Sequence, residues 1–337
     1  MATMRVGIIG AGTIARDHLR ALLALEGVEI VGVVDPVQER AMALAQLAGA
    51  PALAEESALY DRRPQAVWLC TPPDLHPDQT VRAAEAGCHV FCEKPIALDL
   101  AGADRMIAAC RRAGVHLMVG QVIRYYPETL ALKRLVEEGA LGQPLVVFGR
   151  RLLAARPETF PAWRLDPRRS GGFAVESEVH EVDTIRWLGG EVVRVVGQVG
   201  YGWAEHPDFD TVVHGLFTLA SGAAGLLEAS LQSGLRRWEW GVIGHRATAY
   251  SPRRGEVRLI RLADQHEEVI PVEPVVDPAT GVNRSMQAEN REFLEAIRAD
   301  RPPAIPGEEG RADLAVVLAL LQSAREGRPV SLAPAGG

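Results

Sequence analysis

The segment Cys92-Glu93-Lys94-Pro95 contains the first side chain whose type and position could do chemistry. It directly follows an apolar run, residues 88–92, that predicts a strand. A lysine at the carboxyl end of a buried strand can hydrogen-bond a substrate hydroxyl, help to move its proton and stabilise a developing alkoxide. Pro95 lacks a backbone donor and can hold a cis peptide bond, which would set the direction of Lys94. The alternative interpretation is an ordinary surface lysine.

A glycine-rich turn near the N-terminus has the pattern of a dinucleotide site. Residues 4–9 (MRVGII) read as a strand, residues 10–15 (GAGTIA) follow at once, and residues 16–25 have the apolar spacing of a helix. Gly10 permits a tight turn, and Gly12 lets the backbone approach the phosphates without a side chain in the way. The alternative is a plain strand–helix junction, which glycines also close.

The residues after this turn fit the same site. Thr13 and Ile14 open the helix, where unpaired N–H groups and a partial positive charge can hold a pyrophosphate. The small Ala15 lets the helix pack closely on the strand. A second apolar run, residues 29–34, ends at Asp35, which lies 35 − 15 = 20 residues after Ala15. That spacing is expected for a carboxylate that hydrogen-bonds the adenosine ribose.

The same carboxylate determines which cofactor we expect. Asp35 would accept hydrogen bonds from the ribose 2′- and 3′-hydroxyls and would repel the 2′-phosphate of NADP. The next residues, Pro36 and Val37, bring no arginine to offset that repulsion. We therefore predict NAD as the cofactor, with NADP as the less favoured alternative.

Strand-like and helix-like stretches alternate through the first ~120 residues. Helices are expected at residues 37–47, 55–60, 75–86 and 100–113, and further strands at 66–70, 88–92 and 116–120. Nearly continuous apolar strands that alternate with helices predict an α/β Rossmann domain, a doubly wound parallel sheet covered on both faces. Its ligand should bind at the carboxyl ends of the strands, where Lys94 is placed.

The character of the sequence changes near Gln121. Helices are expected at residues 128–138, from after Gly171-Gly172 to about 188, at 285–298 and at 308–325, with a strand at 144–153. Residues 192–272 form short apolar runs with turn-like breaks, which predict a large, mostly antiparallel sheet. We therefore expect two domains: an NAD-binding Rossmann domain, residues 1–121, and an α+β substrate-binding and oligomerisation domain, residues 122–337.

Length and composition are those of an ordinary globular protein. At 337 residues the chain is too long for most single cores, which favours two domains. Hydrophobic residues make up 47% and charged residues 23%, and the net charge of −7 argues against a general binder of nucleic acids or anionic membranes. No apolar run approaches the ~20 residues that span a bilayer, and no signal-peptide pattern is present. We therefore expect a cytoplasmic protein.

The four cysteines, Cys70, Cys88, Cys92 and Cys110, lie mostly within apolar strand or helix patterns. This placement predicts buried free thiols in a reducing compartment rather than a disulfide framework. A metal site at Cys88 and Cys92 is the minor alternative, and we expect no metal.

The sequence resembles a known family, the glucose–fructose oxidoreductase / inositol dehydrogenase / MocA-type (Gfo/Idh/MocA) oxidoreductases. The resemblance rests on the segments GIIGAGTIA, VVDP, CTPPDLH, AGCHVFCEKP, VGQVIRYYP and SGGFAVESEVHEVDTIRWL, in the expected order along essentially the whole chain. CEKP is the most specific of these segments. The resemblance implies the family's fold and domain order, a catalytic role for Lys94 and a cis peptide bond at Pro95.

The resemblance also implies which residues meet the cofactor and the substrate. Thr71, Pro72 and His76 match the segment that borders the nicotinamide and ribose side of the cofactor. The full set expected to bind the cofactor is Gly10, Gly12, Thr13, Ile14, Asp35, Thr71, Pro72, His76, Glu93 and Lys94. The set expected to bind the substrate is Lys94, Arg124, Trp163, Arg164, Glu176 and His180.

The segment around His180 is the second expected source of catalytic groups. Glu176 and His180 align with the ends of the family's D-x-G-x-H pattern, and Asp183 aligns with the acid three residues later. On one helix these positions fall within about 60° of one another, so their side chains would share a face. A histidine oriented by a carboxylate one turn away suits proton exchange with a hydroxyl near neutral pH. We expect His180 to be the general acid/base, and Glu176 its orienting group or a substrate ligand.

The chain departs from the family pattern in this segment. Glu176 replaces the usual aspartate, Glu178 the usual glycine, and Val122 stands where many relatives carry asparagine. Glutamate is one methylene longer than aspartate, so it cannot hold a substrate oxygen in the same place without a shift of the helix. A helix-surface pair or a two-ligand metal site is the alternative interpretation of Glu176 and His180.

Several arginines and two tryptophans are weaker candidates. Trp163 and Arg164 lie where relatives bring a loop over the substrate. Trp238 and Trp240 alternate on an expected strand, so they share a face and are candidates for packing between subunits. The arginines could meet an acidic substrate or be solvated or paired at an interface; they are Arg124, Arg150, Arg151, Arg164, Arg168 and Arg169.

Together these features predict an NAD(H)-dependent oxidoreductase, a dehydrogenase acting on a secondary hydroxyl or ketone of a sugar, cyclitol or related polyol. Lys94 and His180 would handle the proton while a hydride moves to or from the nicotinamide. We expect a homodimer or homotetramer through the sheet of the second domain, and no nucleic-acid or membrane partner. Two alternatives use the same residues: a redox-neutral enzyme that keeps its NAD (an epimerase, eliminase or glycosidase), and a non-catalytic NAD- or sugar-binding protein.

Overall fold

The computed structural model describes residues 3–333, which divide into two compact units. Within this range, unit 1 comprises residues 3–122 and 276–311, and unit 2 comprises residues 123–275 and 312–333. The predicted domain boundary after residue 121 lies one residue from the first crossing between the units. The predicted second domain also included residues 276–311, which belong to unit 1.

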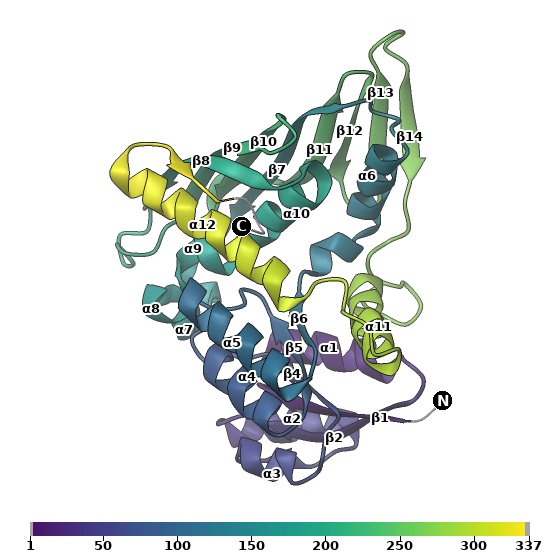
Figure 1. Cartoon of the computed structure of the whole chain (residues 1–337), viewed down its shortest axis with the longest axis vertical. Helices are drawn as coiled ribbons and strands as arrows, with labels where there is room; N and C mark the ends of the chain where they lie inside the picture. The colour runs from purple at the N-terminus through teal and green to yellow at the C-terminus, as the bar shows by residue number, and fades with distance from the viewer. Residues whose placement is uncertain (1–2, 334–337) are drawn as a thin grey trace. The chain divides into compact units, whose positions relative to one another are not determined.

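Unit 1 contains a parallel sheet with helices between its strands (Figure 1). Its elements are β1 (Met4–Ile9), α1 (Thr13–Leu23), β2 (Val28–Val34), α2 (Gln38–Ala48), β3 (Ala52–Leu53), α3 (Glu56–Tyr60), β4 (Ala66–Leu69), α4 (His76–Glu85), β5 (His89–Glu93), α5 (Leu100–Ala113), β6 (Leu117–Gly120) and α11 (Arg284–Arg298). The strands pair in parallel in the order β3-β2-β1-β4-β5-β6. The order reverses between β1 and β4, which is the topology of a doubly wound dinucleotide-binding sheet.

The residues of this sheet explain why it is buried on both faces. Every residue of β4 is buried, and so are nearly all residues of β1 and β5. Glycines admit neighbouring side chains where strands and helices meet closely: a Cβ on Gly7 of β1 would lie 2.7 Å from Leu59 of α3. The predicted Rossmann fold of this part of the chain is confirmed.

Residues 276–311 return to unit 1 through α11. Asn290 on this helix is buried against His18 of α1, although the two residues are 272 positions apart. Phe293 packs edge-on against Trp68 of β4. Farther along, the carbonyl oxygen of Ile305 accepts a hydrogen bond from the backbone N–H of Val119 at 2.9 Å. These long-range contacts are the reason why the unit boundary differs from the predicted one.

Unit 2 is built on a larger sheet (Figure 1). Its elements are η1 (Val122–Tyr125), α6 (Pro127–Glu137), β7 (Pro144–Ala154), η2 (Pro157–Thr159), α7 (Ala162–Leu165), α8 (Pro167–Ser170), α9 (Gly172–Glu176), α10 (Val179–Gly189), β8 (Val192–Gly200), β9 (Val212–Leu219), β10 (Ala224–Ser230), β11 (Gln232–Gly244), β12 (Ala247–Arg253), β13 (Glu256–Arg261), β14 (Glu267–Pro271), α12 (Gly307–Glu326) and β15 (Val330–Ser331), with η1 and α12 starting in unit 1. The strand order is β14-β13-β12-β11-β7-β10-β9-β8-β15, and β7 and β10 form the parallel pair. The predicted mostly antiparallel sheet is confirmed.

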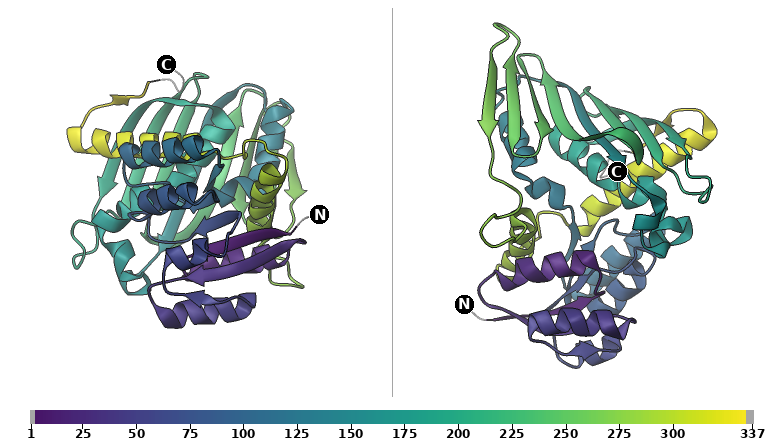
Figure 2. Two further views of the ribbon diagram at one scale, coloured as in Figure 1. Left: turned by 60° about the horizontal axis from the view of Figure 1, so that its bottom comes forward. Right: turned by 180° about the vertical axis from the view of Figure 1, so that it is seen from behind.

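The two faces of the larger sheet differ. Along β9 buried and exposed residues alternate strictly after the first position, as period 2 requires. Helices α6 and α10 cover one face (Figure 2), and small residues there let α12 approach: a Cβ on Gly197 would lie 2.3 Å from the carbonyl oxygen of Leu320. The opposite face exposes large apolar side chains, among them Val196, Leu216, Leu226 and Ile243.

Most predicted helices and strands agree with the structure to within two residues. The short strand β3 and the short helices α7 and α8 were not predicted, because segments of two to four residues carry no periodic signal. The four cysteines are free and buried, as predicted. Among the described residues, no helix is long and apolar enough to cross a membrane.

Candidate active site

The turn between β1 and α1 has the shape that a pyrophosphate site requires. Gly10 has a φ of +95°, and a Cβ there would lie 2.6 Å from the carbonyl oxygen of Cys70, so another residue would be strained. Gly12 precedes α1 without a side-chain cap, and its missing Cβ would meet no atom within 4 Å. Thr13 and Ile14 are the first residues of α1. The open N-terminus of this helix therefore fits an anion.

Asp35 lies directly after β2, beside the glycine turn. Its Oδ2 accepts a hydrogen bond from the backbone N–H of Ala11 at 2.7 Å, and its Oδ1 from that of Val37 at 2.8 Å. These bonds hold the carboxylate at the carboxyl edge of the sheet. Each oxygen keeps a further lone pair, so the group can still accept hydrogen bonds from ribose hydroxyls. The turn and Asp35 together fit NAD.

His76 connects the loop after β4 with the segment that carries Lys94. The ring is fully buried, with Nε2 2.9 Å from the carbonyl oxygen of Thr71 and Nδ1 2.9 Å from that of Pro95. Burial lowers the pKa of His76, while the two carbonyl oxygens fix the position of its ring. Thr71 and Pro72 lie half-buried on this loop. Their contact with the cofactor stays a prediction.

Lys94 directly follows β5 at the same edge of the sheet, and its side chain is half-buried. The Lys94–Pro95 peptide bond is cis, as the family resemblance implied. The backbone N–H of Lys94 donates to Oε2 of Glu93 at 3.1 Å. The glycine turn, Asp35, Thr71 and Lys94 therefore all lie at carboxyl ends of parallel strands, where doubly wound sheets bind ligands.

The single helix predicted from after Gly171-Gly172 to about residue 188 is two helices in unit 2. Helix α9 ends at Glu176 and α10 begins at Val179. Between them, Ser177 has a φ of −111°, far from the value of about −63° in a regular α-helix, so the helix is interrupted there. Glu176 therefore does not lie on the helix that carries His180, and the prediction of one shared helical face is wrong for Glu176.

Glu176 forms an ion pair with Arg164 of α7. Its Oε2 lies 2.6 Å from Nη2 and 2.9 Å from Nε of the guanidinium, which also lies 4.4 Å above the Phe160 ring. Two residues that were predicted to bind substrate are thus brought together, and the half-buried Trp163 precedes Arg164 in the same helix.

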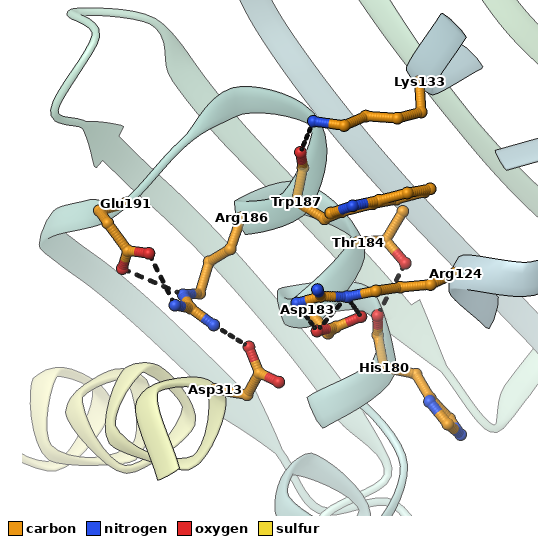
Figure 3. A network of polar contacts seen from close by, with 9 residues as sticks. All are labelled: Arg124, Lys133, His180, Asp183, Thr184, Arg186, Trp187, Glu191 and Asp313. Atoms are coloured by element: carbon orange, nitrogen blue, oxygen red, sulfur yellow. Dashed lines mark hydrogen bonds and ion pairs between the residues drawn. The ribbon is translucent and has the colours of Figure 1, made fainter. Parts of the chain in front are cut away.

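His180 lies near the start of α10 and is 8% exposed. Its backbone oxygen accepts a hydrogen bond from the Thr184 hydroxyl at 2.9 Å, one turn later. Figure 3 shows its ring pointing away from the ion pair between Arg124 and Asp183. Asp183 accepts from Arg124 Nη2 at 2.6 Å. The acid three residues after His180 therefore joins η1 to α10.

Further polar contacts hold the end of α10 (Figure 3). Arg186 pairs with the buried Asp313 of α12 and, at 2.7 Å, with Glu191. Lys133 of α6 donates to the backbone oxygen of Trp187 at 2.9 Å. Because this helix is tied on three sides within unit 2, the backbone of His180 is held in one place.

Glu178, which stands where the family has glycine, lies in a buried cluster. Its Oε1 is 3.6 Å from Nη1 of Arg151, and the same nitrogen is 3.7 Å from Glu181. Burial and then the charge of Glu181 raise the pKa of Glu178 well above its usual range. The indole N–H of Trp238 donates to Glu181 at 2.7 Å. The additional carboxyl is therefore accommodated by an arginine of β7 inside unit 2.

The tryptophans of β11 do not lie on an outer face. Trp240 is fully buried, and both Trp238 and Trp240 contact the ring of Tyr126. The fully buried Trp240 is therefore not available for packing between subunits, whereas for the half-buried Trp238 this role stays a prediction. Alternation in a strand identifies a shared face, but the helices that cover this face come from distant parts of the sequence.

Most of the arginines that the sequence analysis gave as candidates to meet an acidic substrate form ion pairs. The pairs are Arg124 with Asp183, Arg150 with Glu228 and Glu239, Arg151 with Glu181, Arg164 with Glu176, and Arg168 with Asp166. The paired interpretation of these arginines is thus supported for the described structure. In residues 3–333 no group of three His, Cys, Asp or Glu side chains is placed to hold a metal ion.

Two family models match the chain. One is described as "Oxidoreductase family, NAD-binding Rossmann fold" and matches residues 4–121; the other is described as "Oxidoreductase family, C-terminal alpha/beta domain" and matches residues 133–332. The chain belongs to the Gfo/Idh/MocA oxidoreductase family. It is therefore an oxidoreductase whose cofactor is NAD, and the glycine turn and Asp35 fit that cofactor.

Curated relatives in the Gfo/Idh/MocA family align along almost the whole chain. The myo-inositol 2-dehydrogenase of Thermotoga maritima is 28% identical over 347 residues, with 98% of each chain covered. The 1,5-anhydro-D-fructose reductase of Ensifer adhaerens is 30% identical over 348 residues, covering 97% of this chain and 98% of the relative. A structure of levoglucosan dehydrogenase with NADH and levoglucosan has the same fold, with a TM-score of 0.89, 22% identity and coverage of 98% and 99%.

Sequence reasoning missed several polar residues that support the Gfo/Idh/MocA site. Asp210 accepts hydrogen bonds from the backbone N–H groups of Phe173 at 2.9 Å and Ala174 at 2.7 Å, and thereby caps α9. His18 and Asn290 are buried in unit 1. A polar residue within the apolar stripe of a helix is a signal that could have found these two, whereas nothing local marks Asp210.

Proposed function

We propose that this enzyme moves a hydride between NAD and a secondary hydroxyl or ketone of a sugar, cyclitol or related polyol. The named relatives act on myo-inositol and 1,5-anhydro-D-fructose, which are ring polyols of this class. The observation that carries the proposal is the half-buried Lys94, at the same sheet edge as the glycine turn and Asp35. NAD, when bound, supplies the hydride acceptor or donor.

Lys94 is the group proposed to exchange the proton of the reacting hydroxyl. Of the 36 basic residues, only Lys94 and Lys133 are lysines. A guanidinium does not lose its proton in proteins, whereas an ammonium can. Apart from Lys133, every other basic residue of the chain is an arginine. A lysine at position 94 therefore supports a role in which a proton leaves and returns.

His180 is proposed as the second proton-handling group, and Glu176 and Arg164 as substrate ligands. The histidine is held by a well-anchored helix, and an imidazole can both accept and donate a proton. The pairing of Glu176 with Arg164 supports a role in binding hydroxyl groups rather than in orienting His180. Trp163 and Arg124 complete the proposed substrate set.

The proposed cofactor set follows from the edge of the sheet in unit 1. The α1 N-terminus (Gly12, Thr13, Ile14) would hold the pyrophosphate and Asp35 the adenosine ribose. Thr71 and Pro72 would border the nicotinamide side. The buried His76 would act there by holding the Thr71 and Pro95 backbones, with Gly10 shaping the turn.

The experiment that tests this function measures absorbance at 340 nm with excess NAD and a panel of polyols, sugars and sugar acids that includes myo-inositol. Accumulation of many NADH molecules per enzyme is expected. Lys94→Arg keeps the charge but not a transferable proton, so kcat should fall by roughly 10²–10⁴-fold, and His180→Gln by a similar factor. Lys133→Arg is the matched control and should leave kcat unchanged.

The outcomes separate the proposed dehydrogenase from its alternatives. A rise that stops at one NADH per active site would indicate an enzyme that retains its NAD and catalyses a redox-neutral reaction. NAD binding without turnover of any panel member, together with unchanged behaviour of Lys94→Arg, would indicate a non-catalytic binding protein.

The exposed face of the larger sheet is proposed as the contact between copies of this chain. It holds an open groove of about 1120 Å³, lined by side chains from six strands and the end of α12. Its charged groups are largely paired within the chain, as in Arg150 with Glu228 at 2.6 Å, so a second copy would meet an apolar surface without unpaired like charges.

The cytoplasmic location predicted from the sequence stays a prediction that cell fractionation would test.

A further inference from the structure

A chain of buried hydrogen bonds in unit 1 ends at the backbone of Lys94. It runs from Trp68 of β4 to Asn290 of α11, then to His18 of α1 and to Glu93 at the end of β5. His18 and Asn290 are fully buried, and the side chain of Glu93 is 10% exposed. These residues come from four different elements, so the chain joins the helix after the glycine turn to the strand that carries the lysine.

The amide of Asn290 has one possible orientation. An indole N–H can only donate, and the Trp68 indole lies 3.0 Å from Oδ1 of Asn290, so this atom is an acceptor. The other amide atom, Nδ2, lies 3.4 Å from the backbone oxygen of His18 and donates to it. The contacts with the Trp68 indole and with the His18 backbone oxygen therefore both require the same assignment of the Asn290 amide oxygen and nitrogen.

This orientation determines where His18 carries a proton. Nδ1 of His18 lies 2.9 Å from Oδ1 of Asn290, so Nδ1 must be the donor. Nε2 lies 2.7 Å from Oε1 of Glu93. Either Nε2 also carries a proton and donates to a carboxylate, or Nε2 accepts from a protonated carboxyl group. In both cases one proton lies between the two residues and the pair has no net charge.

A neutral pair suits this environment. An isolated charge in such a dry place would be costly, and a shared proton avoids that cost. The nearby thiols of Cys70 and Cys92 are kept neutral because burial raises their pKa, and burial lowers the pKa of His76. His18 is also fixed by the edge of the Phe91 ring, 5.0 Å between centroids.

We infer that His18 and Glu93 are positioning residues that share one proton and hold the backbone of Lys94. While Oε1 of Glu93 meets His18, Oε2 accepts from the N–H of Lys94 at 3.1 Å. Gly120 of β6 leaves room for this arrangement, because a Cβ there would lie 3.2 Å from Oε1. The inference rests on the proton-handling role proposed for Lys94. His18 is fully buried and acts through Glu93.

Two matched pairs of variants test the inference. Glu93→Gln can donate to Nε2 of His18 and accept from Lys94, so it keeps every hydrogen bond while removing the shared proton; Glu93→Ala keeps none. His18→Gln places an amide N–H near the former Nε2, whereas the shorter His18→Asn cannot reach Glu93.

We expect kcat within about threefold of wild type for His18→Gln, and a kcat for Glu93→Gln that is at least about tenfold above that of Glu93→Ala. Glu93→Ala and His18→Asn should lose roughly tenfold to a hundredfold in kcat, because small displacements of a catalytic group have effects of this size. The KM for NAD should change less than about threefold in His18→Asn, since His18 is fully buried. Melting temperatures of all four variants check that each one folds.

Because the sequence contains only two lysines, the environment of Lys94 can also be followed by NMR without measuring turnover. Protein labelled with ¹³C-lysine gives two lysine signals from the sequence positions 94 and 133, and Lys133→Arg identifies the signal of Lys94. In the protein without added NAD, the Lys94 signal should move in His18→Asn and Glu93→Ala and stay near its wild-type position in Glu93→Gln. Imidazole ¹⁵N spectra at pH 7 should show a protonated Nδ1 in His18.

The measurements distinguish failure of this inference from failure of the function proposed for Lys94. An unprotonated Nδ1 in His18, or equal kcat values for His18→Asn and His18→Gln, would overturn the inference. If instead Lys94→Arg retains full kcat, the proposed function of Lys94 fails, and the two NMR measurements still decide whether the pair holds the proton and the lysine backbone.

Discussion

At the scale of single residues, Asp35 is the group on which the cofactor preference depends. Both of its oxygens are held by backbone N–H groups beside the glycine turn, and the neighbouring Val37 is 38% exposed, so an arginine fits at position 37. A fixed carboxylate favours ribose hydroxyls and disfavours a phosphate at the same place.

We predict that Asp35→Ser combined with Val37→Arg shifts the preference from NAD toward NADP. Loss of a charge-assisted hydrogen bond should cost about 1.5–3 kcal/mol of NAD binding, which corresponds to roughly tenfold or more in Kd. Titration calorimetry with both cofactors measures the ratio, with Val37→Arg alone as the control. An unchanged ratio in the double variant would place Asp35 outside the ribose site.

The burial of Glu178 should make the free energy of unfolding depend on pH. Its pKa in the folded protein lies well above the usual value of 4.5, chiefly because of burial. Between these two values the folded state holds a proton that the unfolded state has lost. The unfolded state then binds fewer protons, so the free energy of unfolding falls as the pH rises through this range.

We therefore expect Glu178→Gln, which stays neutral at every pH, to gain stability relative to wild type as the pH increases from about 5 to 8. Urea unfolding at several pH values measures the difference. The exposed Glu85 provides the control, because Glu85→Gln should follow wild type across the range. A constant difference between wild type and Glu178→Gln would show that the Glu178 carboxyl titrates normally in the folded protein.

At the scale of elements, the short helix α9 depends on one side chain from the segment before β9. Asp210 accepts from two backbone N–H groups at the start of α9. Gly172 is required beside it, because its φ is +83° and a Cβ would collide with the Asp210 carboxylate. The helix that carries Glu176 is thus held by a contact that joins residues nearly forty positions apart, 37 in the case of Phe173.

Asp210→Ala should leave these two buried donors without acceptors and lower the free energy of unfolding by about 2–4 kcal/mol. Asp208→Ala, an exposed neighbour on the same segment, should change it by less than about 0.5 kcal/mol. Denaturant titrations of the two variants provide the comparison. Equal stability of both variants would mean that Asp210 does not support α9.

At the scale of the whole molecule, the uncovered face of the larger sheet is the feature that most needs a partner. Leu216 and Leu226 are 50% and 43% exposed on adjacent strands, β9 and β10, and pair directly across the ladder. A contiguous apolar face of this kind is typical of an interface rather than of a solvated surface.

We predict that wild-type protein is a dimer or larger assembly and that Leu216→Arg with Leu226→Arg dissociates it. Two buried charges on each side of an apolar contact would lack partners and repel each other. Sedimentation velocity measures the mass in solution. Leu262→Arg, at an exposed leucine after β13, is the control that should keep the assembly intact. A monomeric wild type, or an intact double variant, would exclude this face as the contact.

The local pattern of the chain was enough to predict much of the fold and the cofactor edge. The strand before Gly10, the helix after Gly12 and the carboxylate at position 35 are separated by short, regular intervals, so sequence spacing determines which of them meet. The same holds for Lys94, because a residue that follows a buried parallel strand must lie at the carboxyl edge of the sheet. Alternation of apolar residues also predicted the larger sheet.

The structural features that depend on contacts between distant parts of the chain could not be predicted from the local sequence pattern. The anchoring of α9 by Asp210, the packing of Trp240 against Tyr126, and the return of α11 to unit 1 each involve residues that lie far apart in the chain. The proton between His18 and Glu93 is a further example, since it follows only once Asn290 is known to lie beside them. Periodicity determines which residues share a face, whereas long-range packing decides what covers that face and which buried polar groups become partners.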